Sequence, residues 1–166
     1  MILFLLSTFE YLCNPARYHR KRPAKKYPER FIQDVDYIEF IDDTYKYMMI
    51  RDRAVQLSVQ GLHIIHTYFE LFPTGLLIIK AGYKWDGPSG PTIDTPSFMR
   101  SSAAHDVCFQ IMREKLIKDE RRAMFFKEAN EDLKTISQED GMLGIRSDWV
   151  KWSVDNFGEK HTVKAA

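Results

Sequence analysis

Cysteine is scarce in this sequence of 166 residues, and its scarcity excludes two kinds of scaffold. The two cysteines, Cys13 and Cys108, lie far apart in the chain. Without a secretory signal, such a pair predicts neither a disulfide framework nor a cysteine-based metal site, and it favours a reducing compartment. Cys108 lies within an apolar helical pattern, so we expect a buried thiol.

Long hydrophobic runs are also missing. The most apolar stretch, residues 1–12, is interrupted by Glu10, whereas a membrane-spanning helix needs about 20 apolar residues. Cations follow this stretch instead of preceding it, so the sequence predicts neither a signal peptide nor a transmembrane segment. We expect a short apolar helix that docks on the rest of the chain or on another protein. A membrane-surface anchor is the less favoured interpretation.

The chain carries little net charge, formally +1, but the charge is distributed unevenly. Residues 1–30 contain seven Lys or Arg and two Glu, which leaves the rest of the chain with a net charge of −4. The basic arm, residues 17–30, mixes cations with prolines, so we expect it to lie extended on the surface. Partner proteins are its expected contacts. Nucleic acid is not favoured, because no element combines aromatic and basic residues.

The central part of the chain has the pattern of short strands. The composition is that of a soluble globular protein, with 45% apolar and 28% charged residues, and the length fits one domain. β-rich runs separated by turn residues predict a small antiparallel sheet from about residue 37 to residue 81. The runs are residues 45–50, 54–59, 62–72 and 76–79, and Pro73-Thr74-Gly75 has the residues of a hairpin turn between the last two.

The periodicity becomes helical after this region. Thr95-Pro96 predicts the start of a helix that runs to about Lys115. Asp119 is expected to cap a second helix that ends at Asp140-Gly141. Ser147 is expected to open a third helix that ends at Gly158 and turns Trp149, Trp152, Ser153 and Phe157 inward. The sequence therefore predicts an α+β fold, a small antiparallel sheet followed by three packed helices. It forms one domain over residues 31–158, with residues 1–30 as a separate arm and residues 159–166 as a tail.

The candidate site lies between the predicted sheet and the first helix. Residues 82–94 contain four Gly or Pro in the five positions after Asp86, which predicts a fixed, irregular loop. The loop supplies Trp85, Asp86 and Asp94, and the helix that follows supplies His105 and Asp106. We expect Asp86, His105 and Asp106 to converge, with Asp94 nearby and Trp85 as a wall.

Three chemical interpretations fit this set of side chains. Imidazole and carboxylate ligands suit zinc, manganese or iron, so His105, Asp86, Asp94 and Asp106 are candidate ligands of a divalent metal that activates water. His105, Asp106 and Asp86 are the candidate catalytic residues. Without a metal, His105 could act as a general base oriented by Asp86. The third interpretation is structural, with a buried histidine bonded to the loop and the aspartates holding backbone amides.

Other sites are less well supported by the sequence. His63 and His66 fall on one predicted strand at positions that point to opposite faces, which is typical of ordinary sheet histidines. The sequence has no glycine-rich phosphate loop, serine-nucleophile elbow or zinc-protease helix motif.

Several pieces of the sequence also resemble a known family. They are residues 82–87 with Pro88 and Pro91, residues 103–106, residues 121–130, residues 139–142 and Phe157-Gly158. In order and spacing, these pieces over roughly residues 45–158 resemble the phage and prophage proteins grouped as domain of unknown function DUF1353.

The resemblance implies a phage or prophage protein of the host cytoplasm or virion, with phage or host proteins as partners of residues 1–30. It implies no established activity. A metal-dependent hydrolase is one expectation, and a non-enzymatic virion or host-interaction protein is the alternative, with the Gly/Pro loop and the arm as contact surfaces. One departure concerns the second helix, where an Ala-Asp pair would be expected and the chain reads Ala129-Asn130. A mechanism that needs a carboxylate there would require Glu128 or Glu131.

Overall fold

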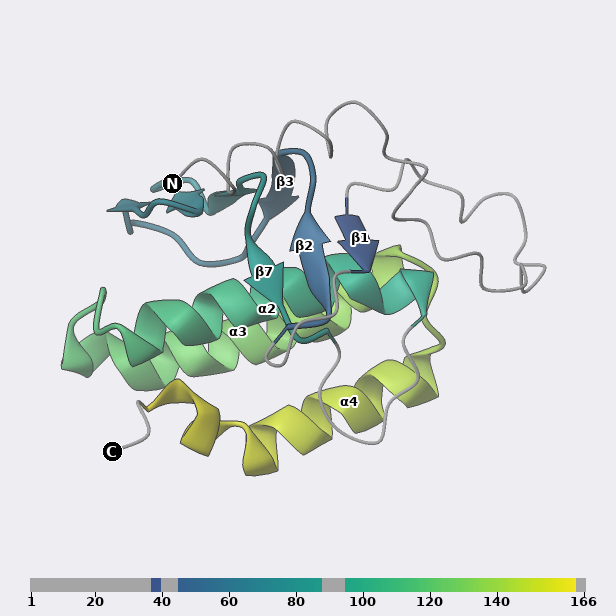
Figure 1. The fold of residues 1–166 in the computed structure, drawn as a ribbon. Helices are drawn as coiled ribbons and strands as arrows, with labels where there is room; N and C mark the ends of the chain where they lie inside the picture. The colour runs from purple at the N-terminus through teal and green to yellow at the C-terminus, as the bar shows by residue number, and fades with distance from the viewer. Residues whose placement is uncertain (1–36, 40–44, 88–94, 164–166) are drawn as a thin grey trace.

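The structure, a computed structural model, describes residues 37–39, 45–87 and 95–163. The expectations for the arm at residues 1–30, and for Asp94 and the prolines of the loop, lie outside these residues. Within them the α+β prediction is confirmed, because short antiparallel strands are followed by three helices. Figure 1 shows the strands gathered on one side of helices α2 and α3, with α4 on the other side.

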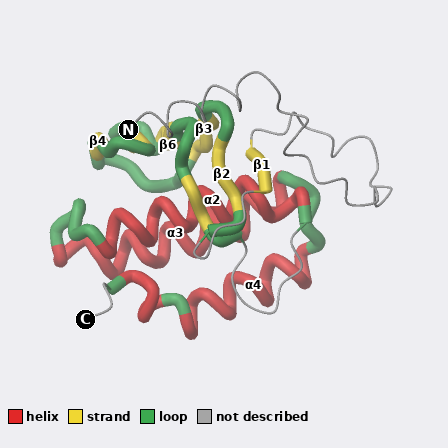
Figure 2. The backbone as a smooth tube through the Cα atoms, in the orientation of Figure 1, coloured by secondary structure: helices red, strands yellow, loops and turns green. Residues whose placement is uncertain are grey.

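The strands form two small sheets, whereas the sequence predicted one. The first sheet has the order β1-β2-β7 and the second has the order β3-β6-β5-β4 (Figure 2). All of the pairings are antiparallel. The strands are β1 (Tyr37–Glu39), β2 (Tyr47–Met49), β3 (Arg53–Gln56), β4 (Ile64–Ile65), β5 (Phe69–Leu71), β6 (Leu76–Ile79) and β7 (Lys84–Trp85).

Two turns account for the second sheet. The run at residues 62–72 is not one strand, because it reverses between β4 and β5, where His66 N–H donates to the Phe69 carbonyl at 2.9 Å. The predicted hairpin between β5 and β6 is confirmed. Its Gly75 has φ 83°, and a Cβ there would lie 2.4 Å from the Leu57 carbonyl oxygen, so only glycine fits.

The helices are α2 (Pro96–Arg113), α3 (Asp119–Glu139) and α4 (Gly144–Phe157), followed by the short 3-10 helix η3 (Glu159–Thr162). Pro96 is at the start of α2, as predicted, because a missing N–H costs nothing in the first turn. Lys118, not Asp119, is the N-cap of α3. No helix in the described ranges is long and apolar enough to cross a bilayer.

Helix α4 differs most from its prediction. It begins at Gly144, three residues before Ser147, whose hydroxyl donates back to the Gly144 carbonyl at 2.9 Å. The large aromatic side chains do not point inward, since Trp149, Trp152 and Phe157 are 42%, 55% and 56% exposed. Val150 and the partly buried Val154 pack inward instead. These two valines pack against Phe98 of α2, Leu133 of α3 and Met142.

The main core lies between the two sheets and the helices α2 and α3. Its largest fully buried side chains are Trp85, Phe69, Phe125, Leu71, Leu77 and Ile79. Cys108 is buried in this core as a free thiol, as predicted. Burial raises the pKa of that thiol, so it is an inert packing group.

Residues 159–163 do not form the loose tail that the sequence predicts. Thr162 is only 1% exposed, and its hydroxyl accepts a hydrogen bond from Arg122 Nη2 at 2.7 Å. Arg122 Nη1 also donates to the Met112 carbonyl near the end of α2 at 2.8 Å. One guanidinium therefore fastens η3 to α2 and α3.

Candidate active site

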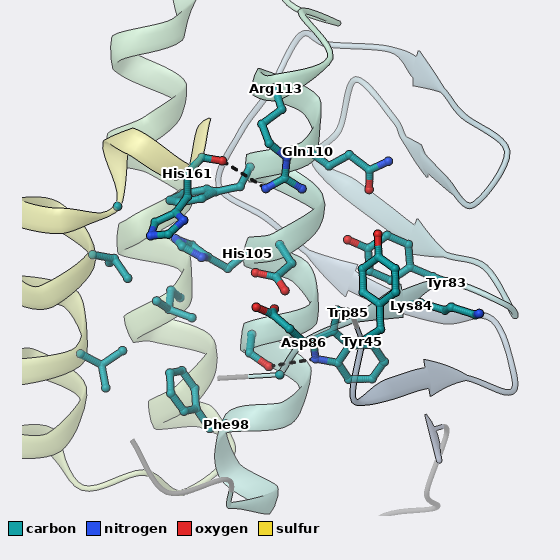
Figure 3. Close-up of a pocket in the computed structure, with 18 of the residues that line it drawn as sticks. Tyr45, Tyr83, Lys84, Trp85, Asp86, Phe98, His105, Gln110, Arg113 and His161 are labelled. Carbon is teal, nitrogen blue, oxygen red and sulfur yellow. Dashed lines mark hydrogen bonds between the residues drawn. The ribbon is translucent and has the colours of Figure 1, made fainter. Parts of the chain in front are cut away.

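A cavity of about 430 Å³ lies where β7, α2 and α4 meet. Figure 3 shows its two sides: Tyr83, Trp85 and Asp86 on the side of the strands, and His105 toward the other helices. All three side chains expected to converge, Asp86, His105 and Asp106, line this cavity, and Trp85 forms part of its wall. Asp94 is outside the described residues.

The strand side of the cavity is anchored by Trp85. Its side chain is 1% exposed, and its indole Nε1 donates to the Ser102 hydroxyl on α2 at 3.3 Å. The ring centroid lies 5.4 Å from that of Tyr47 on the neighbouring strand β2. With β7 fixed in this way, Asp86, the next residue, is placed above the helix.

Gly87, directly after Asp86, has a backbone conformation that other residues rarely adopt. It has φ 79°, and a Cβ at this position would lie 2.5 Å from Cε2 of Tyr47. Glycine is therefore required both by the backbone conformation and by the adjacent ring.

The carboxyl groups of Asp86 and Asp106 share a hydrogen bond across the cavity. Burial raises the pKa of Asp106 well above its usual range, and the charge of Asp86 and their hydrogen bond raise it further. The positive charge of Arg113 acts in the opposite direction but is the smallest of these influences. Burial and the neighbouring carboxyl group of Asp86 therefore both favour the protonated form of Asp106.

His105 lies beside Asp106 on α2 but faces different partners. Its Nε2 lies 2.8 Å from Oδ1 of Asn130 on α3. Its ring packs on Phe109, one turn further along the helix, with a centroid distance of 4.1 Å. Burial lowers the pKa of His105 to about 4, although Asn130 and the charge of Asp155 favour the protonated form. The imidazole is therefore neutral at pH 7.

Asn130 connects His105 to a third helix. It is fully buried, and its Nδ2 donates to Asp155 Oδ1 on α4 at 2.8 Å. Asp155 Oδ2 accepts a second hydrogen bond from Lys151 at 2.6 Å. The sequence analysis singled out Asn130 because it departs from the family pattern, but it did not predict the role of Asp155. The sequence did offer one sign that Asn130 is buried, because this polar residue lies on the second helix near the inward-facing Ala129 and Leu133.

The carboxylate near Asn130 therefore comes from Asp155 and not from the two neighbours suggested by the sequence. Glu131 points to Lys151, at 3.4 Å. One carboxylate oxygen of Glu128, Oε2, is buried and makes no hydrogen bond within the described residues.

The prediction that Asp86 orients His105 is not what the hydrogen bonds show, because His105 bonds to Asn130 and Asp86 bonds to Asp106. Two separate polar units thus meet in one cavity, an acidic pair and a neutral imidazole. Sequence adjacency of His105 and Asp106 does not make them partners, since consecutive residues of a helix point about 100° apart.

The described residues alone do not provide a metal site. Among them, no three His, Cys, Asp or Glu side chains are grouped closely enough to hold an ion. The fourth expected ligand, Asp94, is outside this part of the chain, so the divalent metal stays a prediction.

His63 and His66 do not line the cavity and have separate partners, although the partner of His66, Glu114, does line it. His63 Nε2 is 3.3 Å from Glu70, and His66 Nε2 is 3.5 Å from Glu114. Both rings also stack on phenylalanines, His63 on Phe72 and His66 on Phe69. The prediction that both lie on one strand is wrong, because β4 covers only Ile64–Ile65 and His63 and His66 flank it.

We found no protein-family model, no curated protein and no solved structure that matches this chain. The resemblance to DUF1353 therefore stays a prediction, and the site is interpreted from its own geometry.

Proposed function

We propose that this chain is a hydrolase in which Asp106, paired with Asp86, donates a proton and His105 accepts one. The observation that supports the proposal best is the hydrogen-bonded pair of carboxyl groups lining the same cavity as a neutral imidazole. Carboxyl pairs that share one proton, and imidazoles that are neutral near pH 7, are the usual groups of acid–base catalysis.

The proposed reaction uses one water molecule. His105 takes a proton from the water as its oxygen attacks the substrate, and Asp106 gives its proton to the leaving group as the old bond breaks. The imidazolium then returns its proton to the Asp86–Asp106 pair through solvent, so the site ends in its starting state. The carboxylate of Asp86 accepts the hydrogen bond that orients the proton of Asp106 before transfer.

The cavity indicates a small substrate or one short segment of a polymer. Its volume of about 430 Å³ is within the range of small-ligand pockets. Phe98 and Phe109 supply apolar wall, and Tyr45 is 40% exposed at the same cavity. We propose an ester, amide or glycosidic bond as the target, because each needs one proton accepted and one donated.

The setting of this activity is part of the proposal. A phage or prophage protein, in the host cytoplasm or the virion, follows from the resemblance of residues 45–158 to DUF1353. Zinc, manganese or iron would enter the same site only with Asp94 as a further ligand, and no step of the proposed reaction depends on such a metal. The arm at residues 1–30 would serve contacts with phage or host proteins.

The test is a panel of chromogenic esters, anilides, glycosides and phosphodiesters, incubated with the full chain in EDTA and separately with zinc, manganese or iron(II). Hydrolysis in EDTA is the expected result. Asp106→Asn and His105→Gln should each lower kcat by about 100-fold or more, which is the usual contribution of a general acid or base. Asp148→Asn, which changes an exposed carboxylate on α4, is the matched control and should keep full activity.

Other outcomes separate the alternatives. Hydrolysis that requires added metal, with elemental analysis showing one ion that His105→Ala loses, would replace the proposed reaction by the metal-dependent one. Turnover of the panel that survives both Asp106→Asn and His105→Gln would contradict a site at this cavity. No turnover and no metal would leave the non-enzymatic virion or host-interaction protein as the better interpretation.

A further inference from the structure

We propose that Asn130 and Asp155 are positioning residues that determine which ring nitrogen of His105 carries the proton. The assignment of the proton is argued from hydrogen bonds alone and does not depend on any reaction. Its consequence for catalysis rests on the proposed role of His105 as the base.

The chain of hydrogen bonds starts at Asp155 on α4. Oδ2 of Asp155 accepts from Lys151 Nζ at 2.6 Å, and Oδ1 accepts from Asn130 Nδ2 at 2.8 Å. A carboxylate can only accept hydrogen bonds, so the amide nitrogen of Asn130 has to face Asp155. The amide oxygen of Asn130 consequently faces His105.

The second step follows from the same inventory of donors and acceptors. Oδ1 of Asn130 lies 2.8 Å from Nε2 of His105, and an amide oxygen can only accept. Nε2 must therefore carry the hydrogen. A neutral imidazole has a single N–H, so Nδ1 keeps its lone pair.

The surroundings of the ring support this assignment. Asn130 is 0% exposed, so bulk water does not compete for its amide. The ring of Phe109 packs on the imidazole at 4.1 Å and restricts its rotation. Nδ1 makes no hydrogen bond with any residue that the structure describes, and the ring lines the cavity.

Asn130 alone could not make this choice. An amide can present either its oxygen or its nitrogen to an imidazole, and the two ends would favour opposite tautomers. Asp155 selects one end, and Lys151 holds the Asp155 carboxylate in place. Asp155 on α4 therefore determines which ring nitrogen of His105 on α2 is free to accept a proton.

The direct test is nitrogen NMR of the histidine side chains in the full chain at pH 7, with His105 assigned from the signals lost in His105→Gln. The shifts of the two ring nitrogens report which one is protonated. We expect Nε2 in the range of a protonated imidazole nitrogen and Nδ1 in the range of an unprotonated one. The opposite tautomer, or rapid averaging of the two, would overturn the proposal.

Two variants separate a positioning role from general support of the fold. Asp155→Ala removes the acceptor that orients Asn130, so the tautomers should become mixed. The exchanged double variant, Asn130→Asp with Asp155→Asn, keeps an acceptor facing Nε2 and a donor between the two side chains, so it should restore the single tautomer. The control is Asp148→Ala, which is also on α4. It removes the ion pair between Asp148 and Lys134 of α3, and the histidine signals should stay unchanged.

Stability measurements keep the test decisive if a variant folds poorly. Asp155→Ala counts only if its circular dichroism spectrum matches that of the parent chain. If it does not, Asp155→Gln takes its place, because the longer amide moves its oxygen out of register. A histidine spectrum unchanged in a folded variant at position 155 would overturn the role of Asp155.

Kinetics then connect the tautomer to the proposed reaction. With a substrate from the panel, Asp155→Ala should lower kcat at least 10-fold with little change in KM, and the exchanged variant should recover most of it. An unchanged kcat in spite of mixed tautomers would overturn the catalytic consequence. If the panel gives no turnover at all, the proposed hydrolase fails while the nitrogen shifts still decide the tautomer.

Discussion

Asp106 on helix α2 and Asp86 directly after strand β7 share a hydrogen bond between their carboxyl groups. The pair joins the sheet to the helix across a cavity, and burial and the neighbouring carboxyl group of Asp86 both raise the pKa of Asp106 well above its usual range. Asp86 is exposed and Asp106 is partly buried, and both line the cavity. The pair is therefore open to a molecule in the cavity, as a proton-donating group of a site has to be.

The protonation of Asp106 can be measured through the pH dependence of stability. Its folded pKa is raised above the unfolded value near 3.8, so the folded state binds the proton more tightly, and stability falls as pH rises from about 4 through the raised pKa. Asp106→Asn removes this loss. In urea unfolding from pH 4 to pH 9, the unfolding free energy of the variant should rise relative to that of the parent chain. The rise should be about 1.4 kcal/mol for each unit by which the pKa of Asp106 is shifted.

Asp148→Asn is the control for that comparison, because Asp148 is an exposed carboxylate on α4. Its unfolding free energy should show no gain over that of the parent chain as the pH rises. Parallel curves for Asp106→Asn would mean that Asp106 is ionised in the folded protein.

His105 should produce a pH dependence of the opposite sign. Its folded pKa is lowered from 6.5 to about 4, so the unfolded chain binds the proton more tightly, and stability is lost as pH falls from about 6.5 to about 4. The loss amounts to about 3 kcal/mol. His105→Gln should abolish this part of the acid destabilisation in urea unfolding, whereas His63→Gln, at a more exposed histidine, should retain it. The same acid slope in both variants would contradict a buried neutral His105.

Local sequence signals predicted the elements that depend on neighbouring residues. Thr95-Pro96 marked the start of α2, and Pro73-Thr74-Gly75 marked the hairpin, because a proline in a first turn and a glycine at positive φ act within a few residues. The positions of His105 and Asp106 on α2 followed from these signals. So did Asp86, which the glycine-rich turn places at the end of a strand.

The partners in the site could not be predicted in the same way. The bond between His105 and Asn130, and that between Asn130 and Asp155, depend on how three helices pack, and their members lie 25 positions apart in the sequence. The face of α4 was wrong because tryptophan was taken as a core residue. Large aromatic side chains are often only partly buried, since much of a folded protein's surface is contributed by apolar atoms.

Gly87 should be less tolerant of substitution than Gly82. Both have positive φ, 79° and 88°, but a Cβ at Gly87 would meet the buried ring of Tyr47 at 2.5 Å, whereas at Gly82 the nearest atom is 3.7 Å away. Gly82→Ala should cost about 1 kcal/mol or somewhat more, from the backbone alone. Gly87→Ala should cost at least about 1 kcal/mol beyond that, from overpacking. Urea unfolding of the two variants measures the difference, and equal losses would contradict a fixed Tyr47 ring.

The last prediction concerns Arg122 and the C-terminal turn. Arg122 donates to Thr162 Oγ1 at 2.7 Å and to the Met112 carbonyl at 2.8 Å. In the same region, Arg113 at the cavity donates to the His161 carbonyl at 3.1 Å. Arg122→Ala should therefore lower the unfolding free energy by about 2 kcal/mol, because hydrogen bonds from a charged donor are lost. Arg121→Ala, which removes a more exposed bond to the Gln60 carbonyl, is the control and should cost less.

A double-mutant cycle separates this contact from general helix effects. Thr162→Val removes only the hydroxyl, so combining it with Arg122→Ala should cost less than the sum of the two single losses, by about 0.5–1 kcal/mol. Because η3 also bonds to Arg113, loosening it should weaken the positive charge of Arg113 that lowers the pKa of Asp106. In Arg122→Ala the fall of stability with rising pH should then extend to higher pH than in the parent chain. Strict additivity in the cycle, together with an unchanged pH profile, would show that η3 is not coupled to the site.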